Sequence, residues 1–283
     1  MKWKFLWLRQ EKNNDKNIMM KFSKMHALGN DFMVIDGVTQ SLEILEIPSS
    51  IIAKFADRHR GIGFDQCLLI QPALNDTMDF FYTIFNADGS EVGQCGNGAR
   101  CVARFIHEKK LSTKTSLTLG TKTTRLKVLL QDEHYREITA ELGIPSIDSE
   151  SLMISSQTLH AVNLGNPHAV IEVQDLNMIA VDEIGKVLNK DAHFSDGVNV
   201  EFMQVINENN LTLRVYERGV GETQACGSGA CAAMVCARKF YGAASTMNVA
   251  LPGGVLHVAW QGDGYPVFLT GEAVHVFDGI IDF

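Results

Sequence analysis

The stretch "ETQACGSGACAAMVCAR" at residues 222–238 decides the fold, because its pattern occurs twice in the chain. "EVGQCGNGARCVAR" at residues 91–104 has the same order: an acidic residue, a cysteine, Gly-x-Gly and then a helical pattern. Around these stretches, residues 82–99 align without a gap with residues 213–230, and the two cysteines fall at the same position. An internal repeat of this kind changes the architecture that the sequence predicts.

Two further pairs of segments repeat in the same order. "ALGNDFMVID" (27–36) resembles "NLGNPHAVIE" (163–172), and "FDQCLLI" (64–70) lies opposite "VNVEFMQVI" (198–206). Because three blocks keep their order and nearly the same offset, we predict two copies of one fold. The turn-rich residues 141–152 are the expected junction between them.

Each half has several short alternating segments that are typical of strands, such as residues 116–131 and 254–271. Each half also has a helical pattern directly after its cysteine, and in the second half almost every residue of this helix is apolar. A helix that is hydrophobic all round is enclosed by the rest of the protein. The sequence therefore predicts an α+β fold that is rich in strands and poor in helices.

The composition excludes some partners. The 283 residues are 46% hydrophobic and carry a formal net charge of −8, with no Lys/Arg cluster, so we expect no nucleic-acid partner. Residues 1–19 start basic and contain one apolar patch that is too short for a signal peptide or a membrane span. We expect this extension to be disordered, and the protein to be cytoplasmic and without a membrane partner.

Six cysteines are present, and their spacing is not that of zinc sites, so we expect no metal. Four of them lie in apolar strands or within the two helices and are interpreted as small core residues: Cys67, Cys101, Cys231 and Cys236. The repeated cysteines, Cys95 and Cys226, precede the helices. The N-terminus of a helix stabilises a thiolate, so both are candidates for bases or nucleophiles.

Two equivalent thiols that face each other across a pseudo-twofold axis suit racemisation or epimerisation. One thiol can remove a proton from one face of a carbon while the other delivers a proton to the opposite face. Backbone N–H groups at the two helix N-termini are placed to hold the reacting carboxylate. No cofactor is expected. Dinucleotide binding by "GSGACA" (227–232) is excluded, because no acidic residue lies between Thr223 and Gln261 to bind a ribose.

At this point the motifs resemble those of a known family. They are "KMHALGNDF", "RGIGFDQ", "FNADGSEVGQCGNGARC", "LGNPHAV", "DGVNVEF" and "YERGVGETQACGSGA". From about residue 20 to its end the chain is similar to diaminopimelate epimerase, a cofactor-independent family that interconverts LL- and meso-diaminopimelate in lysine and peptidoglycan synthesis. The resemblance implies two repeats, each a mostly antiparallel, strand-rich barrel around a central helix. It places the first repeat at 20–140, with 272–283 returning to it, and the second at 141–271.

The resemblance also implies roles for individual residues and a homodimer. Cys95 and Cys226 would be the acid–base residues, and His168 and Glu217 would modulate their pKa. The substrate, a small molecule, would be bound by Asn30, Gln66, Asn86, Gly96, Asn97, Asn166, Asn199, Glu217, Arg218, Gly227 and Ser228. Arg218 would bind the distal carboxylate of diaminopimelate as a bidentate partner.

Departures from the family pattern are few. Ala27 replaces a usual Gly, Ser195-Asp196 replaces Pro-Glu, and Phe64 replaces a small residue where it could narrow the wall beside Gln66. Two alternatives stay open at this stage. One is a related racemase of proline-like substrates, which gives no reason for Arg218 and the set of asparagines. The other is a redox-sensing binding protein in which Cys95 and Cys226 form a reversible disulfide.

Overall fold

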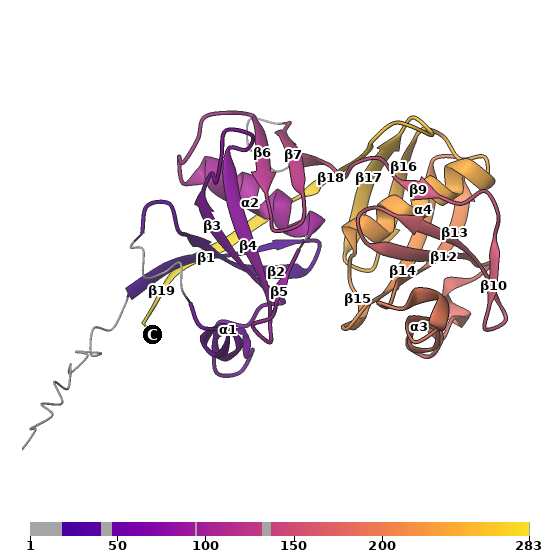
Figure 1. Ribbon diagram of the computed structural model, residues 1–283, viewed down its shortest axis with the longest axis horizontal. Coiled ribbons are helices and arrows are strands. Elements are labelled where there is room, and N and C mark those ends of the chain that lie inside the picture. The colour runs from indigo at the N-terminus through magenta and orange to yellow at the C-terminus, as the bar shows by residue number, and fades with distance from the viewer. Residues whose placement is uncertain (1–18, 41–46, 94, 132–136, 283) are drawn as a thin grey trace, which may run out of the picture.

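The structure, a computed structural model, describes residues 19–40, 47–93, 95–131 and 137–282. It consists of two lobes that lie side by side (Figure 1). The expected disorder of the N-terminal extension lies outside the described residues, except that Met19 begins the first strand.

The first lobe is made from the N-terminal half of the chain and its last strand. Its elements are β1 (Met19–Ala27), β2 (Asn30–Asp36), α1 (Ser49–Ala56), β3 (Gln66–Pro72), β4 (Phe80–Asn86), β5 (Glu91–Val92), α2 (Gly96–Glu108), β6 (Ser116–Gly120), β7 (Arg125–Leu130), β8 (Glu137–Glu141) and β19 (Val274–Asp282).

The second lobe repeats this order. Its elements are β9 (Ser146–Ile147), β10 (Leu152–Ile154), β11 (Gln157–Asn163), β12 (Pro167–Glu172), the 3₁₀ helix η2 (Leu176–Met178), α3 (Val181–Asn189), the 3₁₀ helix η3 (Ala192–Phe194), β13 (Asn199–Asn207), β14 (Asn210–Glu217), β15 (Gly221–Thr223), α4 (Gly227–Phe240), β16 (Thr246–Leu251), β17 (Gly254–Trp260) and β18 (Val267–Glu272).

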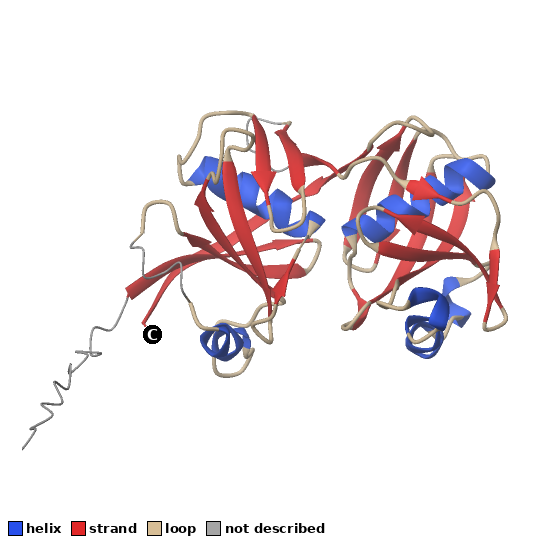
Figure 2. Cartoon of the chain, viewed as in Figure 1, coloured by secondary structure: helices blue, strands red, loops and turns tan. Residues whose placement is uncertain are grey.

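Strand pairing is the same in both lobes. In the first, β1–β2, β3–β4, β6–β7 and β7–β8 are antiparallel, whereas β2–β3 and β4–β6 are parallel. In the second, β11–β12, β13–β14, β16–β17 and β17–β18 are antiparallel, whereas β12–β13 and β14–β16 are parallel. The strands wrap around one central helix in each lobe (Figure 2). The predicted fold class, two strand-rich and mostly antiparallel repeats around central helices, is confirmed.

The lobes exchange strands at their junction. β8 and β18, the last strand of each repeat, pair antiparallel with Thr139 opposite Thr270. The chain then crosses over both times: β9, which follows β8, pairs with β11 of the second lobe, and β19, which follows β18, pairs with β1 of the first. The first repeat is therefore completed by β19, a strand that comes from the other end of the sequence.

The central helices form the core. The predicted enclosure of α4 is confirmed, since its residues from Gly227 to Ala237 are buried, apart from Ser228, which is half-buried. Cys67, Cys101, Cys231 and Cys236 are all fully buried, as expected for core residues. Smaller clusters pack under α1 and α3 on the outer side of the sheets. Each fully buried aliphatic side chain contributes about 1.5–3 kcal/mol to stability, so this packing fixes the positions of the two helix N-termini.

Candidate active site

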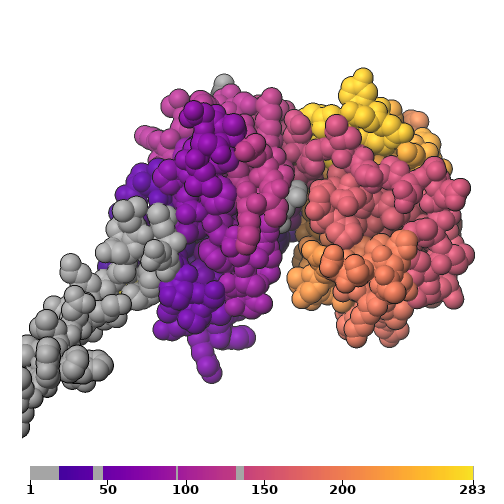
Figure 3. Space-filling view, in the orientation of Figure 1, coloured from indigo at the N-terminus to yellow at the C-terminus, as the bar shows by residue number. Residues whose placement is uncertain are grey.

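A cavity of about 700 Å³ opens between the lobes, where the N-termini of α2 and α4 meet. Figure 3 shows the hollow between the two lobes on one face of the molecule. The lining comes from both repeats and combines polar side chains with glycines and small apolar residues. It consists of Gly29, Asn30, Arg58, Asp65, Gln66, Asn86, Ala87, Asp88, Cys95, Gly96, Asn97, Asn166, Glu217, Gly219, Val220, Glu222, Thr223, Gln224, Ala225, Cys226, Gly227 and Ser228.

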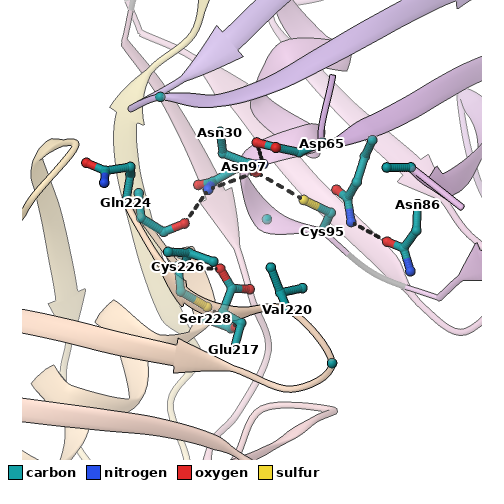
Figure 4. Close-up of a pocket in the computed structure, with 18 of the residues that line it drawn as sticks. Asn30, Asp65, Asn86, Cys95, Asn97, Glu217, Val220, Gln224, Cys226 and Ser228 are labelled. Atoms are coloured by element: carbon teal, nitrogen blue, oxygen red, sulfur yellow. Dashed lines mark hydrogen bonds between the residues drawn. The ribbon is translucent and has the colours of Figure 1, made fainter. Parts of the chain in front are cut away.

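Cys95 and Cys226 are the N-cap residues of the two central helices. Both have extended backbones, with φ/ψ of −151°/109° and −121°/113°. The Gly98 N–H donates to the Cys95 Sγ over 3.3 Å, and the Cys226 Sγ lies 3.7 Å from the Ser228 hydroxyl. Each thiol thus sits over the unpaired N–H groups of a helix, and both line the same cavity (Figure 4).

The glycines after each cysteine are required by close packing. A Cβ on Gly98 would lie 3.2 Å from the Leu68 side chain, and a Cβ on Gly229 would lie 2.8 Å from Glu201 Oε1. Neither glycine has a positive φ, so the small size of the residue, and not its backbone conformation, is what these positions use. Equivalent strands, β3 and β13, therefore press against equivalent first turns of α2 and α4, and a larger residue would push the helix away from the thiol.

Burial dominates the acidity of the two thiols. It raises the pKa of Cys95 to about 11, even though the Gly98 and Asn97 N–H groups act in the opposite direction. Burial, and then the Glu217 and Glu201 carboxylates, raise the pKa of Cys226 well above its ordinary value. The helix N-terminus does favour the thiolate, as the sequence predicted, but removing the thiol from water has the larger effect.

Asn97 joins the two repeats below the thiols. Its Nδ2 donates to Asn30 Oδ1 and to the carbonyl of Ala225 in the second repeat, each over 3.3 Å (Figure 4). The Cys95 thiol lies 4.0 Å from the same Asn30 oxygen. Because one amide spans from β2 to the chain before α4, it ties the position of one thiol to that of the other.

Asn30 is held in turn by charged residues that the sequence analysis did not single out. Its Nδ2 donates to Asp65 Oδ2 over 3.0 Å, and Arg58 donates to both Asp65 and Asp31. Asp65 and Asp31 lie at the start of the parallel strands β3 and β2. Asp65 directly precedes Gln66 in the "FDQ" motif, so its place near the site could have been predicted from the sequence. The place of Arg58 could not, because it depends on how the loop after α1 returns to the sheet.

Gln66 and Asn86 form a pair on neighbouring strands. Gln66 Nε2 donates to Asn86 Oδ1 over 3.1 Å, and both side chains line the cavity. Phe64, in contrast, is buried in the cluster under α1 and is absent from the lining. The expectation that Phe64 narrows the wall beside Gln66 is therefore wrong, because Phe64 lies before β3 begins and its ring packs against Ile52 and Phe55 of α1.

His168 and Glu201 form a fully buried pair beneath α4. His168 Nδ1 lies 2.7 Å from Glu201 Oε1, and His168 Nε2 lies 3.1 Å from Asn166 Oδ1. Both ring nitrogens of His168 thus lie within hydrogen-bond distance of an oxygen. Asn166 Nδ2 donates to the Ser228 hydroxyl over 3.4 Å, which links the pair to the neighbourhood of Cys226. His168 itself does not line the cavity.

Glu217 lies at the end of β14 and lines the cavity beside Cys226. Its Oε1 accepts a hydrogen bond from the Thr223 hydroxyl over 2.6 Å. Burial raises the pKa of Glu217 above its ordinary value. Thr223, within the repeated block, holds this carboxylate and was also missed by the sequence analysis.

Asn199 and Arg218 are placed differently from the other expected binding residues. Arg218 Nη1 donates to the Asp196 carbonyl over 2.8 Å, and the Arg218 N–H donates to Asn199 Oδ1 over 2.9 Å. Neither residue lines the cavity. The structure thus brings the two thiols, Glu217, Gly96, Gly227, Ser228 and five of the predicted amides together at the cavity, with Asn97 as the bridge between repeats. It leaves Arg218 turned toward the loop after η3.

The arrangement can carry out acid–base chemistry on two faces of one carbon. Thiols from two repeats flank the cavity, and the N-termini of two helices offer N–H donors for an anion. Within the described ranges, no three His, Cys, Asp or Glu side chains cluster in a way that could bind a metal ion. Over the same ranges, no helix has the length and apolar character needed to cross a membrane.

Comparisons with known proteins agree with this geometry. A family model described as diaminopimelate epimerase matches residues 22–147 and 160–276. A phenazine biosynthesis protein of the PhzF family from Bacillus anthracis has a similar structure, with a TM-score of 0.69 at 15% identity, covering 93% of this chain and 99% of that one. A hydroxyproline epimerase from Agrobacterium vitis, solved with bound trans-4-hydroxy-L-proline, has a TM-score of 0.69 at 18% identity, covering 94% and 93%. The structural matches show a shared fold, and because the family model covers most of both repeats, this chain belongs to the diaminopimelate epimerase family.

Proposed function

We propose that the protein is a cofactor-independent epimerase that interconverts LL- and meso-2,6-diaminopimelate. One observation carries the proposal: Cys95 and Cys226 cap equivalent helices of the two repeats and line the same cavity. An enzyme that inverts a stereocentre needs an acid–base group on each side of the reacting carbon, and the repeat supplies such a pair.

In the proposed reaction, one cysteine is a thiolate and the other a thiol. The thiolate removes the α-proton, the C–H electron pair moves into the planar carbanion that the carboxylate stabilises, and the opposite thiol donates its proton to the other face. The two sulfurs thus exchange their protonation states. Because burial raises the pKa of both thiols, the thiolate is a strong base when it forms.

Acid–base catalysis by the two thiols is not sufficient to stabilise the carbanion. General acid–base catalysis contributes typically ~10²–10⁴-fold, and each well-placed donor to a developing negative charge can add about 2.7–4 kcal/mol. We assign this role to the N–H groups of Gly96, Asn97, Gly227 and Ser228, which belong to the first turns of α2 and α4. Two helix dipoles would then point at one carboxylate.

The remaining polar residues suit a substrate with two amino-acid ends. The amides of Asn30, Gln66, Asn86 and Asn166 lie in or at the edge of the cavity and can bind a zwitterion without adding net charge. We propose that Arg218, supported by Asn199, leaves the Asp196 carbonyl to bind the distal carboxylate. A proline-like substrate has no distal carboxylate and would leave this arginine without a role.

The family also supports a cellular context. We propose that the protein acts in lysine and peptidoglycan synthesis as a cytoplasmic homodimer. Sedimentation equilibrium of the purified protein would test the oligomeric state, since a monomer at micromolar concentration would contradict this part of the proposal.

Proton exchange is the direct test of the function. The protein is incubated with LL-diaminopimelate in D₂O under a reductant, and the α-proton signal is followed by NMR while the meso isomer is quantified. We expect the signal to be lost at a rate that falls by at least ~10²-fold in C95S and in C226S. The matched control is C236A, because Cys236 is buried in α4 and does not line the cavity.

The same assay with trans-4-hydroxy-L-proline separates the alternatives. Exchange of the hydroxyproline α-proton, with none in diaminopimelate, would assign the chain to the racemases of proline-like substrates. An intact α-proton in both compounds would contradict catalysis by the thiol pair.

A further inference from the structure

The N-terminal half of α2 contains a buried cation that the proposed reaction has not used. Arg100 is fully buried, with 0% of its surface exposed. Its Nη2 donates to Asn97 Oδ1 over 2.9 Å and its Nε donates to the Glu272 carbonyl over 3.4 Å. Nη1 has no hydrogen-bond partner among the residues that the structure describes. Arginine stays protonated at neutral pH, so this site holds a positive charge without a bonded carboxylate.

The guanidinium reaches across the boundary between the repeats. Its Nη1 is 3.8 Å from where a Cβ on Gly227 would lie, and its Cζ and Nε are 3.5 Å from that of Gly271. The repeat offset places Arg100 opposite Cys231 of α4. The first repeat thus contributes a cation where the second contributes a small apolar residue, so a single guanidinium lies between the two helix N-termini.

The residues that surround the two thiols also differ in charge. The repeat alignment places Asn86 opposite Glu217, and Gly98 contacts Leu68 where Gly229 faces Glu201. The first repeat therefore has neutral residues where the second has two carboxylates.

The charged and titratable groups around Cys95, Cys226 and Arg100 agree with this difference. After burial and the Gly98 N–H, the charges acting on the pKa of Cys95 are Glu217, which raises it, and Arg100, which lowers it. For Cys226 they are Glu217 and Glu201, which both raise it. Burial lowers the pKa of Arg100 itself, and the groups that face it are Cys101, Cys95, Cys231 and Glu272.

We propose that Arg100 is a positioning residue of this active site: it holds the Asn97 amide that bridges the repeats, and its charge favours the thiolate at Cys95 over the thiolate at Cys226. The proposal rests on the proposed function for its role in catalysis. The unequal charge has a use, because a two-base site works only when one thiol is ionised and the other is not. A nearby positive charge lowers the pKa of a thiol and so favours its ionised form.

Alkylation of the thiols tests the charge without any substrate. Iodoacetamide labelling is followed by mass spectrometry from pH 7 to 11, for Cys95 in a C226S background and for Cys226 in a C95S background. We expect R100Q to slow the labelling of Cys95 about tenfold below its pKa, and R100K to change it by less than about threefold, since lysine keeps the charge. The labelling of Cys226 should change by less than about threefold in both variants.

Activity with diaminopimelate tests the positioning role in the two variants that keep both thiols. We expect R100K to lower kcat about tenfold or more with a smaller change in KM, because a lysine cannot reproduce the planar contact to Asn97. Should R100Q fail to fold, as judged by circular dichroism and thermal unfolding, R100K still decides: full activity in R100K overturns the proposal. Equal slowing of both thiols in R100Q, or none, also overturns it.

The two proposals fail separately. Wild-type protein that exchanges no α-proton contradicts the epimerase function, whatever the labelling shows. Wild-type protein that exchanges the proton while R100Q labels like wild type contradicts only the role of Arg100.

Discussion

The hydroxyl oxygens of Thr139 in β8 and Thr270 in β18 lie 2.6 Å apart, where the last strands of the two repeats pair. Thr139 is buried and also accepts a hydrogen bond from Gln131 over 2.7 Å. The contact therefore joins the lobes on the strands that lead out of the junction.

We expect this pair to be energetically coupled. T139V and T270V should each lower the free energy of unfolding by about 1 kcal/mol, because each removes the hydrogen bond between the two hydroxyls. The double variant should lose less than the sum, by about 0.5–1 kcal/mol. Urea unfolding of the four proteins measures the cycle, and purely additive losses would show that the two hydroxyls act independently.

Oxidation should inactivate the protein by joining its two active-site thiols. Diamide accepts two electrons and two protons as Cys95 and Cys226 form a disulfide, and dithiothreitol should restore activity. The other four cysteines are fully buried, so C236A should respond to diamide as the wild type does. Non-reducing peptide mapping checks the link, and an inactive oxidised sample with both thiols free would contradict it.

The negative charge of Glu217 should lower the reactivity of the Cys226 thiol. Glu217 raises the pKa of Cys226, so E217Q should lower that pKa and speed the labelling of Cys226 by iodoacetamide at pH 8, by about threefold or more. The mirror variant in the first repeat is N86D, which adds a carboxylate at the equivalent position. It should slow the labelling of Cys95. Unchanged labelling in both variants would rule out this electrostatic control.

Arg218 should affect the binding of substrate more than the chemical step. If it binds the distal carboxylate, R218M should raise KM for LL-diaminopimelate by about tenfold or more and change kcat by less than about threefold. Steady-state kinetics measure both constants. R125M is the control, since Arg125 is an exposed residue of β7 far from the lining. An unchanged KM in R218M would remove Arg218 from the site.

Asp31 should make stability depend on pH in the acid range. Burial raises its pKa, but hydrogen bonds from Arg58 and Lys24 lower it further, to about 2. A carboxyl whose pKa is depressed in the folded state stabilises it above the unfolded pKa of ~3.9, and this contribution is lost as the pH falls through about 2.

D31N should therefore lower the free energy of unfolding by on the order of 1 kcal/mol at pH 7 and change it little near pH 2. Chemical denaturation at several pH values measures the difference, with D76N, an exposed acidic residue, as the control. A loss of the same size at both pH values would mean that the charge of Asp31 is not its cause.

Much of the fold could be predicted because the sequence contains an internal repeat. The repeated block around Cys95 and Cys226 fixed the equivalence of α2 and α4, and apolar alternation indicated strands such as β6, β7, β17 and β18. Both cysteines, and the glycines after them, were placed correctly at helix N-termini because this junction is local in sequence.

Contacts between distant segments could not be predicted in the same way. Arg58 reaches Asp65 and Arg100 reaches the second repeat only after the loops and lobes have assembled, and no local pattern encodes either distance. The acidity of the thiols was also misjudged, because the helix terminus is visible in the sequence whereas the depth of burial is not. The position of Phe64 was also mispredicted, because this residue lies in the loop before β3 and its packing against α1 depends on how that loop folds.

The pairing of β19 with β1 means that the first lobe cannot be completed without the C-terminal end of the chain. A polypeptide cut between β8 and β9 would give an N-terminal fragment whose β1 lacks its nine-residue neighbour, leaving an open edge that invites aggregation. The N-terminal half therefore needs a substitute for the missing strand before it can be studied, or could have been selected, as an independent domain. Separately expressed halves should recover solubility only when they are produced together.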